Sequence, residues 1–468
     1  MLFPTLTFGL FFLAIYTLSW SVRRSNEWRK ILLLVASWIF YGAWDWRFVA
    51  LLIGSAMLNW GAARLIDRSD GAARRKALVV AGVAANLAIL GTFKYFDFFL
   101  EQAGMLLAAA GWQRDLPLLQ IILPVGVSFF TFQGISYVVD VHRRKVAAAG
   151  LLDITLLMSF FPHLVAGPIV RASDLLPQFR HSPRIDRGMA AMGLLLISWG
   201  LFKKAVIASE LSVGLVDPVF FDPGAHSRID LIAAAYGYAI QIYCDFSAYS
   251  DMAIGIAALL GYRFPHNFNQ PYRAASLQDF WRRWHISLSS WLRDYLYIPL
   301  GGSRGGAVSA CRNLLITMLL GGLWHGAKWT FLLWGGLHGL VLSIERLWRA
   351  VKPAGWPALP RPLAIFCTFH IVTLGWIFFR ADSFDSASSY LRGLARPDRL
   401  PLTVTPLAVA LILLGGAMHF TPRHMMQGIA LQVRRSPALL IGFGLGVAIL
   451  LIDAMRFEGV APFIYYQF

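Results

Sequence analysis

The chain has 468 residues, of which 57% are hydrophobic and only 14% are charged. Soluble domains carry about 25% charged residues, and the mean hydropathy here is +0.58. These values exclude an ordinary soluble protein and predict an integral membrane protein. Because apolar segments recur along the whole length, we expect one all-α transmembrane domain over residues 1–468, without a separate soluble domain.

The net charge is +17, which in a soluble protein would suggest nucleic acid as a partner. Here the Lys and Arg residues lie mainly in short segments between apolar runs, a pattern typical of cytoplasmic loops and of contact with anionic lipid headgroups. We therefore expect membrane lipids as partners and no nucleic acid. The three Cys residues are far apart, and neither CxxC nor HExxH occurs, so we expect no disulfide framework and no metal site.

Apolar segments that could cross or enter a bilayer follow one another from the N-terminus. They are residues 2–20, 31–44, 48–62, 77–100, 119–139, 151–170, 229–243, 248–260, 314–340, 363–379, 407–420 and 439–454. With bent or paired segments, they predict roughly 11–13 membrane helices. The loops at 23–30 and 64–76 are basic, whereas those at 45–47 and 101–118 are poor in basic residues, so the positive-inside rule places the N-terminus outside the cytoplasm.

Several of these segments contain helix breakers or polar residues. Residues 151–170 include Pro162 and two further breakers, and are typical of kinked or re-entrant helices around a cavity. Asp245 lies between two apolar runs, at an unusual depth for an acid. Residues 261–306 are too polar to span and are expected to lie at an interface or to dip inward. Residues 314–340 are expected to be bent or paired around His325.

Candidate chemistry concentrates between Asp279 and His325, where polar groups are costly unless they are paired or used. His325 lies between Trp324 and Gly326, and the glycine is expected to let a ligand approach the backbone. A neutral imidazole there could accept a proton from a hydroxyl. A packing role, with a bond to a neighbouring carbonyl, remains an equal alternative for His325, and His285 could belong to a structural ion network.

The basic residues of this stretch allow two interpretations. Arg282, Arg283 and Arg293 could bind phosphate groups. They could equally pair with Asp279 and Asp294 or extend to lipid headgroups. No nucleotide-binding glycine motif accompanies them.

The remaining histidines have less support. His163, beside Pro162, could cap a broken helix or face the same cavity as His325. The others have no polar partners nearby in the sequence and are interpreted as incidental: His266, His338, His370 and His419.

Three motifs together resemble the membrane-bound O-acyltransferase superfamily. They are Asp279-Phe280-Trp281-Arg282-Arg283-Trp284-His285, Leu292-Arg293-Asp294-Tyr295-Leu296-Tyr297-Ile298-Pro299-Leu300-Gly301-Gly302 and Trp324-His325-Gly326. The run 298–302 is similar to the alginate O-acetyltransferase branch. Further matches are Cys244-Asp245-Phe246-Ser247 and Phe264-Pro265 with Asn267-Phe268. The resemblance covers essentially the whole chain, with the catalytic motif region at 261–345.

The resemblance implies a helix bundle around a central tunnel and acyl transfer to a hydroxyl. It implies that His325 is catalytic and that His285 is the second signature residue. It further implies acetyl-CoA as a cytoplasmic donor substrate, with no bound cofactor. The product would be an O-acetylated cell-envelope polysaccharide, alginate or a similar exopolysaccharide. The reaction would take place at the bacterial inner membrane, with a periplasmic acetyltransferase as partner.

Roles for the tunnel residues follow as hypotheses. His325 would either deprotonate the acceptor hydroxyl or carry the acetyl group, and His285 would orient the acyl group or donate to the developing oxyanion. An apolar wall would limit hydrolysis of the thioester. The residues expected at the tunnel are Trp281, Trp284, Trp324, Asp279, Arg282, Arg293, Asp245, Asn267 and His163.

Two alternatives remain. D-alanyl or other acyl transfer to teichoic acid, lipid or peptidoglycan is a second enzymatic possibility, although the run 298–302 favours the polysaccharide branch. A polysaccharide transporter or export channel would require two matched half-chains, and the sequence has no such internal symmetry.

Overall fold

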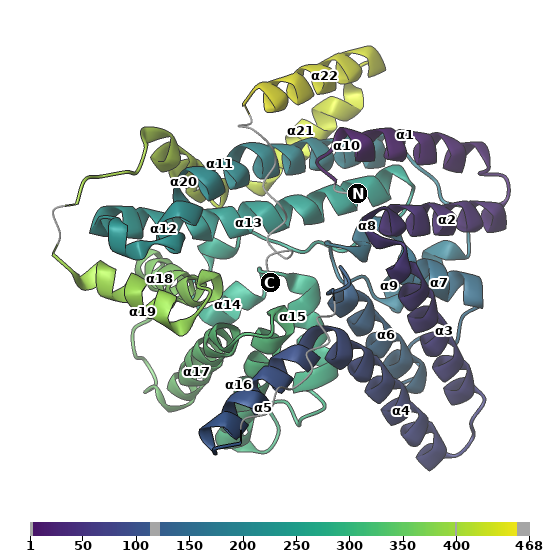
Figure 1. Ribbon diagram of the computed structural model, residues 1–468. Coiled ribbons are helices and arrows are strands. Elements are labelled where there is room, and N and C mark those ends of the chain that lie inside the picture. The colour runs from purple at the N-terminus through teal and green to yellow at the C-terminus, as the bar shows by residue number, and fades with distance from the viewer. Residues whose placement is uncertain (1–2, 113–121, 398–399, 456–468) are drawn as a thin grey trace. The chain divides into compact units, whose positions relative to one another are not determined.

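The computed structural model describes residues 3–112, 122–397 and 400–455. All secondary structure in these ranges is helical (Figure 1). Five helices within them are long and apolar enough to cross a membrane: Arg47–Asp67, Ala72–Ala109, Arg187–Phe221, Gly306–His325 and Arg361–Arg380. The all-α, multi-pass membrane architecture is thereby confirmed. The expected total of roughly 11–13 membrane helices also included shorter apolar helices, such as Leu6–Ser21 and Pro406–Met418.

The chain forms two compact units. The first consists of Met1–Ile185 and Ile256–Pro265, and the second of Asp186–Gly255 and His266–Phe468. The expected single domain over residues 1–468 stays a prediction.

The first unit contains nine described helices, and a π-helical turn, Gly91–Tyr95, joins two of them. The helices are α1 (Leu6–Ser21), α2 (Asn26–Asp45), α3 (Arg47–Asp67), α4 (Ala72–Leu90), α5 (Phe96–Ala109), α6 (Val127–His142), α7 (Leu151–Ser159), α8 (Phe161–Leu164) and α9 (Ala172–Phe179).

Helix α6 forms the centre of this unit and packs against α3 and α4, with nearly all of its side chains buried. It approaches α3 closely at Gly134, where a Cβ would collide with the side chain of Asn59. Asn59 and Asn86 exchange side-chain hydrogen bonds of 3.1 and 2.8 Å. The exchange satisfies two buried amides in an otherwise apolar bundle.

The expected break within residues 151–170 is confirmed. Phe160, between α7 and α8, has a non-helical ψ of 109°. Pro162 follows in the first turn of α8, where its missing N–H leaves no helical hydrogen bond unmade.

The last residues of α13 (Arg228–Leu259) also belong to the first unit. Gly261 follows them with a φ of +83°, the left-handed conformation that commonly ends a helix. The indole of Trp20 donates to the carbonyl of Leu259 at 3.2 Å, and the guanidinium of Arg29 donates to that of Leu260 at 2.7 Å. A cation at this position is favourable because helix C-terminal carbonyls carry partial negative charge.

The second unit contains the rest of α13 and twelve further described helices. They are α10 (Arg187–Phe202), α11 (Ser209–Leu211), α12 (Asp217–Phe221), α14 (Leu277–Trp281), α15 (Ile286–Leu292), α16 (Gly306–His325), α17 (Trp329–Val351), α18 (Arg361–Arg380), α19 (Phe384–Ala395), α20 (Pro406–Met418), α21 (Arg423–Arg435) and α22 (Ala438–Met455).

Helix α13 corrects one prediction. Two separate spans were expected at residues 229–243 and 248–260, and the structure instead forms one continuous helix. The acids that suggested the break are neutralised by buried lysines of a π-helical turn, Lys203–Ala208. Lys204 lies 2.8 Å from Asp245, and Lys203 lies 2.6 Å from Asp251. Buried charges are tolerated when they are paired in this way.

The expected helix pair around His325 is confirmed: α16 and α17 are neighbours joined by a short turn (Figure 1). A Cβ at Gly322 would collide with the carbonyl oxygen of Phe331, and one at Gly335 with that of Met318. The two backbones therefore touch, the arrangement that small residues permit between membrane helices.

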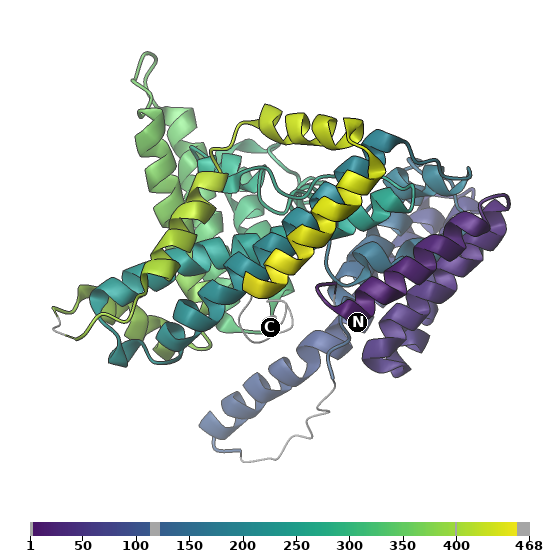
Figure 2. The ribbon, with the colours of Figure 1, turned by 90° about the horizontal axis from the view of Figure 1, so that it is seen from above.

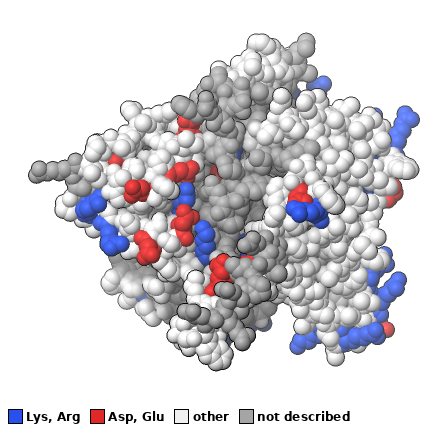
Figure 3. All heavy atoms as spheres, in the orientation of Figure 1, with Lys and Arg blue, Asp and Glu red and all other residues white. Residues whose placement is uncertain are grey.

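The surface agrees with a membrane location. On the face shown in Figure 3, most described atoms belong to residues other than Lys, Arg, Asp and Glu.

In Figure 2, the yellow helices α21 and α22 lie beside α10. Residues 352–360, between α17 and α18, are all exposed and form the green loop that extends from these two helices.

We expect Gly335→Ala to destabilise the protein and Gly336→Ala not to. The first Cβ would meet the backbone of α16, whereas the nearest atom to the second is Cδ2 of Leu319, at 3.5 Å. Both substitutions favour the helical conformation equally, by up to about 1 kcal/mol. The difference in stability between the two variants therefore measures the collision of the Cβ at position 335 with α16, which we expect to cost about 1–3 kcal/mol. The measurement is the thermal unfolding midpoint of both purified variants in the same detergent. Equal midpoints would contradict the backbone contact.

Candidate functional site

His325 is the last residue of α16 and is only 4% exposed. The ring centroids of Trp324, Trp334 and Phe379 lie 5.0, 5.1 and 5.2 Å from that of its imidazole. All three rings contact it at steep angles, edge to face. His325 is thus enclosed by aromatic side chains of the second unit and does not face lipid.

The turn after His325 corrects the expectation for Gly326. A Cβ at this position would enter the ring of Phe331. The ring of Phe331 in turn packs against Phe379, with centroids 4.8 Å apart. The glycine therefore makes room for an aromatic wall of the imidazole and does not provide an approach for a ligand.

His285 immediately precedes α15 and is fully buried. Its Nδ1 lies 3.1 Å from Oδ1 of Asn267. The same oxygen accepts hydrogen bonds from the backbone N–H of Ser287 at 3.2 Å and from its hydroxyl at 2.8 Å. The carbonyl of Asn267 also accepts from the N–H of Ile286 at 2.9 Å. Asn267 therefore holds both the start of α15 and the imidazole of His285.

Trp324 connects the two histidines. Its ring centroid lies 6.2 Å from that of His285 and 5.0 Å from that of His325. The structure thus brings together His285, Asn267, Trp324 and His325, four of the residues that the sequence singled out.

Trp334, which contacts His325, belongs to a larger cluster of aromatic side chains. Trp334 contacts Trp281 and Trp376, with centroids 5.7 and 5.9 Å apart, and Trp376 contacts Trp284 at 5.0 Å. His338, interpreted from the sequence as incidental, belongs to this cluster. Its Nδ1 accepts a hydrogen bond of 3.2 Å from the indole N–H of Trp281. This partner was not apparent from the sequence, because Trp281 lies 57 positions away, and the interpretation of His338 as incidental to the chemistry stays a prediction.

A cavity of about 800 Å³ lies between α14, α15, α16, α17 and the π-helical turn Arg293–Tyr297. Its described lining is Gln278, Trp281, Arg282, Ile286, Ser289, Ser290, Leu292, Arg293, Tyr297, Ser303, Gly306, Ala307, Leu314, Thr317, Met318, Leu342, Arg346, Arg349 and Ala350. Four of these residues are arginines and none is acidic. The lining therefore combines positive charge with apolar walls.

Two residues of the cavity lining lie close to the histidines in the chain. Ile286, in its lining, directly follows His285. Met318 lies two helical turns before His325 on the same face of α16, about 10 Å along the axis. Trp281 forms the wall that separates the cavity from the aromatic cluster. The cavity lining thus shares α15 and α16 with the segments that carry the two histidines, neither of which is among its described residues.

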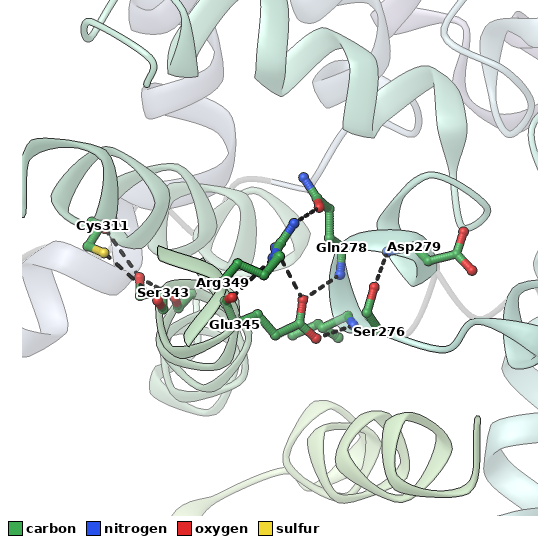
Figure 4. Close-up of polar contacts among 9 residues, drawn as sticks. Ser276, Gln278, Asp279, Cys311, Ser343, Glu345 and Arg349 are labelled. Carbon is green, nitrogen blue, oxygen red and sulfur yellow. Dashed lines mark hydrogen bonds and ion pairs between the residues drawn. The ribbon is translucent and has the colours of Figure 1, made fainter. Parts of the chain in front are cut away.

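Hydrogen bonds from α17 hold the wall of this cavity in place (Figure 4). The carboxylate of Glu345 accepts from the N–H groups of Leu277 and Gln278, at 2.6 and 3.2 Å. Arg349 donates to the side-chain oxygen of Gln278 at 2.5 Å. A carboxylate at a helix N-terminus satisfies amides that have no helical acceptor. The position of α14, and with it of Trp281, is therefore set by α17.

The charged residues expected at the tunnel divide into two groups. Arg282 and Arg293 line the cavity. Asp279 is not among the described residues of the lining: its carboxylate pairs with Arg283 at 2.8 Å, and in Figure 4 it points away from Glu345. Its expected place at the tunnel stays a prediction. Asp245 is likewise absent from the lining, because it forms the buried ion pair with Lys204.

His163 lies in the first unit, so its expected place beside His325 stays a prediction. Its Nε2 lies 3.0 Å from the carbonyl of Leu157 and 3.2 Å from the amide nitrogen of Gln133. These contacts fit the alternative, structural interpretation.

Sequence reasoning missed the contribution of α17. Trp334, His338, Leu342 and Arg346 recur at intervals of four, so they share one face of the helix. That spacing was the signal that would have added Trp334 and Arg346 to the candidate residues.

The arrangement can bind an anionic substrate and transfer protons beside it. Arginines recognise phosphate or carboxylate groups, and a buried imidazole is favoured in its neutral, proton-accepting form. Among the described residues, no group of three or more His, Cys, Asp or Glu side chains is placed to hold a metal ion.

Several known proteins are similar to this chain in sequence. The membrane-bound O-acyltransferase family model matches residues 147–381. Probable alginate O-acetylase AlgI of Pseudomonas aeruginosa is 42% identical over 384 residues, which cover 80% of this chain and 70% of that protein. Peptidoglycan O-acetyltransferase of Helicobacter pylori is 38% identical over 392 residues, covering 78% and 73%. Teichoic acid D-alanyltransferase of Streptococcus thermophilus is 27% identical over 286 residues, covering 54% and 68%.

These matches confirm the resemblance that the motifs around His285 and His325 predicted. The chain belongs to the membrane-bound O-acyltransferase family and is an O-acyltransferase embedded in the membrane by several helices.

Proposed function

We propose that this chain takes acetyl groups from acetyl-CoA for the O-acetylation of a cell-envelope polysaccharide, such as alginate, another exopolysaccharide or peptidoglycan. The observation that carries the proposal is the pair of buried imidazoles around Trp324, next to a cavity with four arginines. Acetyl is favoured over D-alanyl because the relatives named for O-acetylation are 42% and 38% identical, and the D-alanyltransferase is 27% identical over a shorter region.

The cavity supports a phosphate-bearing donor. Guanidinium groups pair with phosphate oxygens in a bidentate geometry, and CoA carries phosphates at one end and the thioester at the other. The volume of about 800 Å³ lies within the usual range for ligand pockets, about 300–1,000 Å³. Apolar side chains such as Leu292, Met318 and Leu342 would contact the pantetheine arm between the arginines and the aromatic wall.

In the proposed reaction, the acetyl group passes from the thioester to a hydroxyl oxygen, the carbon–sulfur bond breaks, and CoA leaves as its thiol. His325 either accepts the hydroxyl proton or carries the acetyl group between donor and acceptor. Both roles need a neutral imidazole, which burial favours. The aromatic rings around His325 would keep water from the thioester.

The proposal includes a direction of transfer. The basic loops at residues 23–30 and 64–76 favour a periplasmic N-terminus by the positive-inside rule. The donor would then enter from the cytoplasm of a bacterial cell and the acetyl group would leave outward across the inner membrane. A periplasmic acetyltransferase would act as the partner that delivers it to the polysaccharide.

We expect His325→Ala to lower polysaccharide acetylation by about 10²–10⁴-fold, the usual contribution of a proton-transferring side chain. The measurement is the acetyl content of the envelope polysaccharide in cells that carry the variant in place of the parent chain. The control is His424→Ala, at an exposed position, with the amount of each variant in the membrane fraction quantified. Acetylation at the parent level with His325→Ala would rule out the role of His325.

We expect Arg282→Gln to raise the KM for acetyl-CoA about tenfold, equivalent to 1.4 kcal/mol, with little change in kcat. The reason is that a phosphate contact far from the reacting atoms is made equally in the ground and transition states. The measurement is CoA release by the protein in proteoliposomes.

The matched control for this prediction is Arg283→Gln, which removes the same charge from the neighbouring residue, whose side chain pairs with Asp279. With S-acetylpantetheine, which lacks the phosphates, Arg282→Gln should behave like the parent chain. A parental KM for acetyl-CoA in Arg282→Gln would contradict phosphate binding in the cavity.

A further inference from the structure

Asn267 is the centre of a buried hydrogen-bond network around His285. Its Oδ1 lies 3.1 Å from Nδ1 of His285 and accepts from the backbone N–H and the hydroxyl of Ser287. Its Nδ2 donates to the hydroxyl of Ser250 on α13 at 3.0 Å. Asn267 and His285 are among the most deeply buried polar residues of the second unit, at 1% and 0% exposure.

The network determines which nitrogen of His285 carries the proton. The backbone N–H of Ser287 can only donate, so the atom of Asn267 that faces it is the carbonyl oxygen Oδ1 and not the amide nitrogen. Oδ1 can only accept, so Nδ1 of His285 must be the protonated nitrogen. In the neutral imidazole, Nε2 then carries the lone pair and can accept a proton but has none to donate.

The backbone conformation at His285 also indicates that the surrounding structure holds this residue in one orientation. Its φ of +41° and ψ of 57° lie in the left-handed region, which costs a non-glycine residue roughly 1–2 kcal/mol. Such conformations persist where the surroundings impose them, and they cluster at functional sites. The ring is further fixed by Phe246, in an edge contact of 4.6 Å, and by Trp324.

We infer that Asn267 is a positioning residue that holds His285 with Nε2 unprotonated, so that His285 takes the proton of the acceptor hydroxyl during acyl transfer. Of the two roles proposed for His325, this leaves it to carry the acetyl group. This inference rests on the proposed function and reverses the sequence-based hypothesis for His285. A neutral imidazole bonded in this way cannot donate to the developing oxyanion through Nε2.

The proton step balances without another reactant. The imidazole of His325 first takes the acetyl group from the thioester, the carbon–sulfur bond breaks, and CoA leaves as its thiol with the proton that His325 gives up. The hydroxyl oxygen then forms its bond to the acetyl carbon as its proton passes to Nε2 of His285. The bond between the acetyl carbon and His325 then breaks, and the imidazolium of His285 returns the proton to His325, which gives the ester and a neutral imidazole at both residues. Asn267 supports the transient imidazolium, because Oδ1 accepts from Nδ1–H in both protonation states.

Titratable groups lie on the elements packed against His285. His325 ends α16, and on α13 the carboxylates of Asp245 and Asp251 are paired with lysines. On the segment that leads to His285, the guanidinium of Arg283 is paired with Asp279. A substitution at Asn267 leaves all of these groups in place, so a change in pH dependence reports the direct partner of His285.

The first test is the pH profile of kcat in Asn267→Asp. The carboxylate keeps the acceptor for Nδ1–H and adds a negative charge, which favours the imidazolium and raises the pKa of His285. Since a proton acceptor works only when unprotonated, the fall in activity at low pH should move upward, by about 1–3 units. The control is Asn269→Asp, the same change in a neighbouring residue whose backbone bonds to Arg283. A parental profile in Asn267→Asp would overturn the inference, even if activity were reduced.

The second test does not depend on activity. Nitrogen-15 NMR of histidine-labelled protein in proteoliposomes distinguishes the two neutral tautomers, with the signals of His285 assigned by their loss in His285→Gln. We expect protonated Nδ1 and unprotonated Nε2. The opposite tautomer would overturn the inference directly.

His285→Gln completes the comparison, since it retains polar atoms but cannot accept the proton. Its kcat should fall about 10²–10⁴-fold, and parental kcat in a folded His285→Gln protein would overturn the proton step. If the parent chain transfers no acetyl group from any donor, the proposed function and the proton step fail together. The NMR spectrum still decides the tautomer in that case.

Discussion

The backbone contact between α16 and α17 is the constraint on which the candidate site depends. Gly322 and Gly335 have no side chains to hold the helices apart, so each backbone reaches a carbonyl of the other helix. Lipid provides no hydrophobic force between helices, and close packing takes its place. The contact brings Trp334 of α17 against His325 at the end of α16. A wider separation would open the imidazole to lipid or water.

Several deeply buried charges and amides of the second unit have a partner from another segment. Lys203 and Lys204 neutralise acids of α13, and Asn267 holds His285. Leaving one partner alone in such surroundings would cost several kcal/mol. The pairs therefore fix the relative positions of the segments as well as compensating their own burial.

The second unit separates recognition from chemistry. Four arginines line the cavity, where a charged substrate group can remain near water, whereas the imidazole of His325 is enclosed by aromatic rings. Trp281 joins the two regions, because it lines the cavity and donates to His338 within the cluster. Helix α17 supports both regions, since Glu345 anchors α14 on one part of its surface and Trp334 covers His325 on another.

Four features could be predicted from the sequence: the membrane class, the break beside Pro162, the helix pair at His325 and the family. They depend on local hydropathy and on residues that are close together in the chain. The tertiary structure alone decided the other features. They are the continuity of α13, the packing of the Phe331 ring against Gly326, and the positions of Trp334, His338 and Arg346. Each depends on a partner that periodicity cannot identify: Asp245 suggests a break in a helix until Lys204 lies beside it. The sequence determined which residues are chemically capable, and packing between distant segments decided which of them meet.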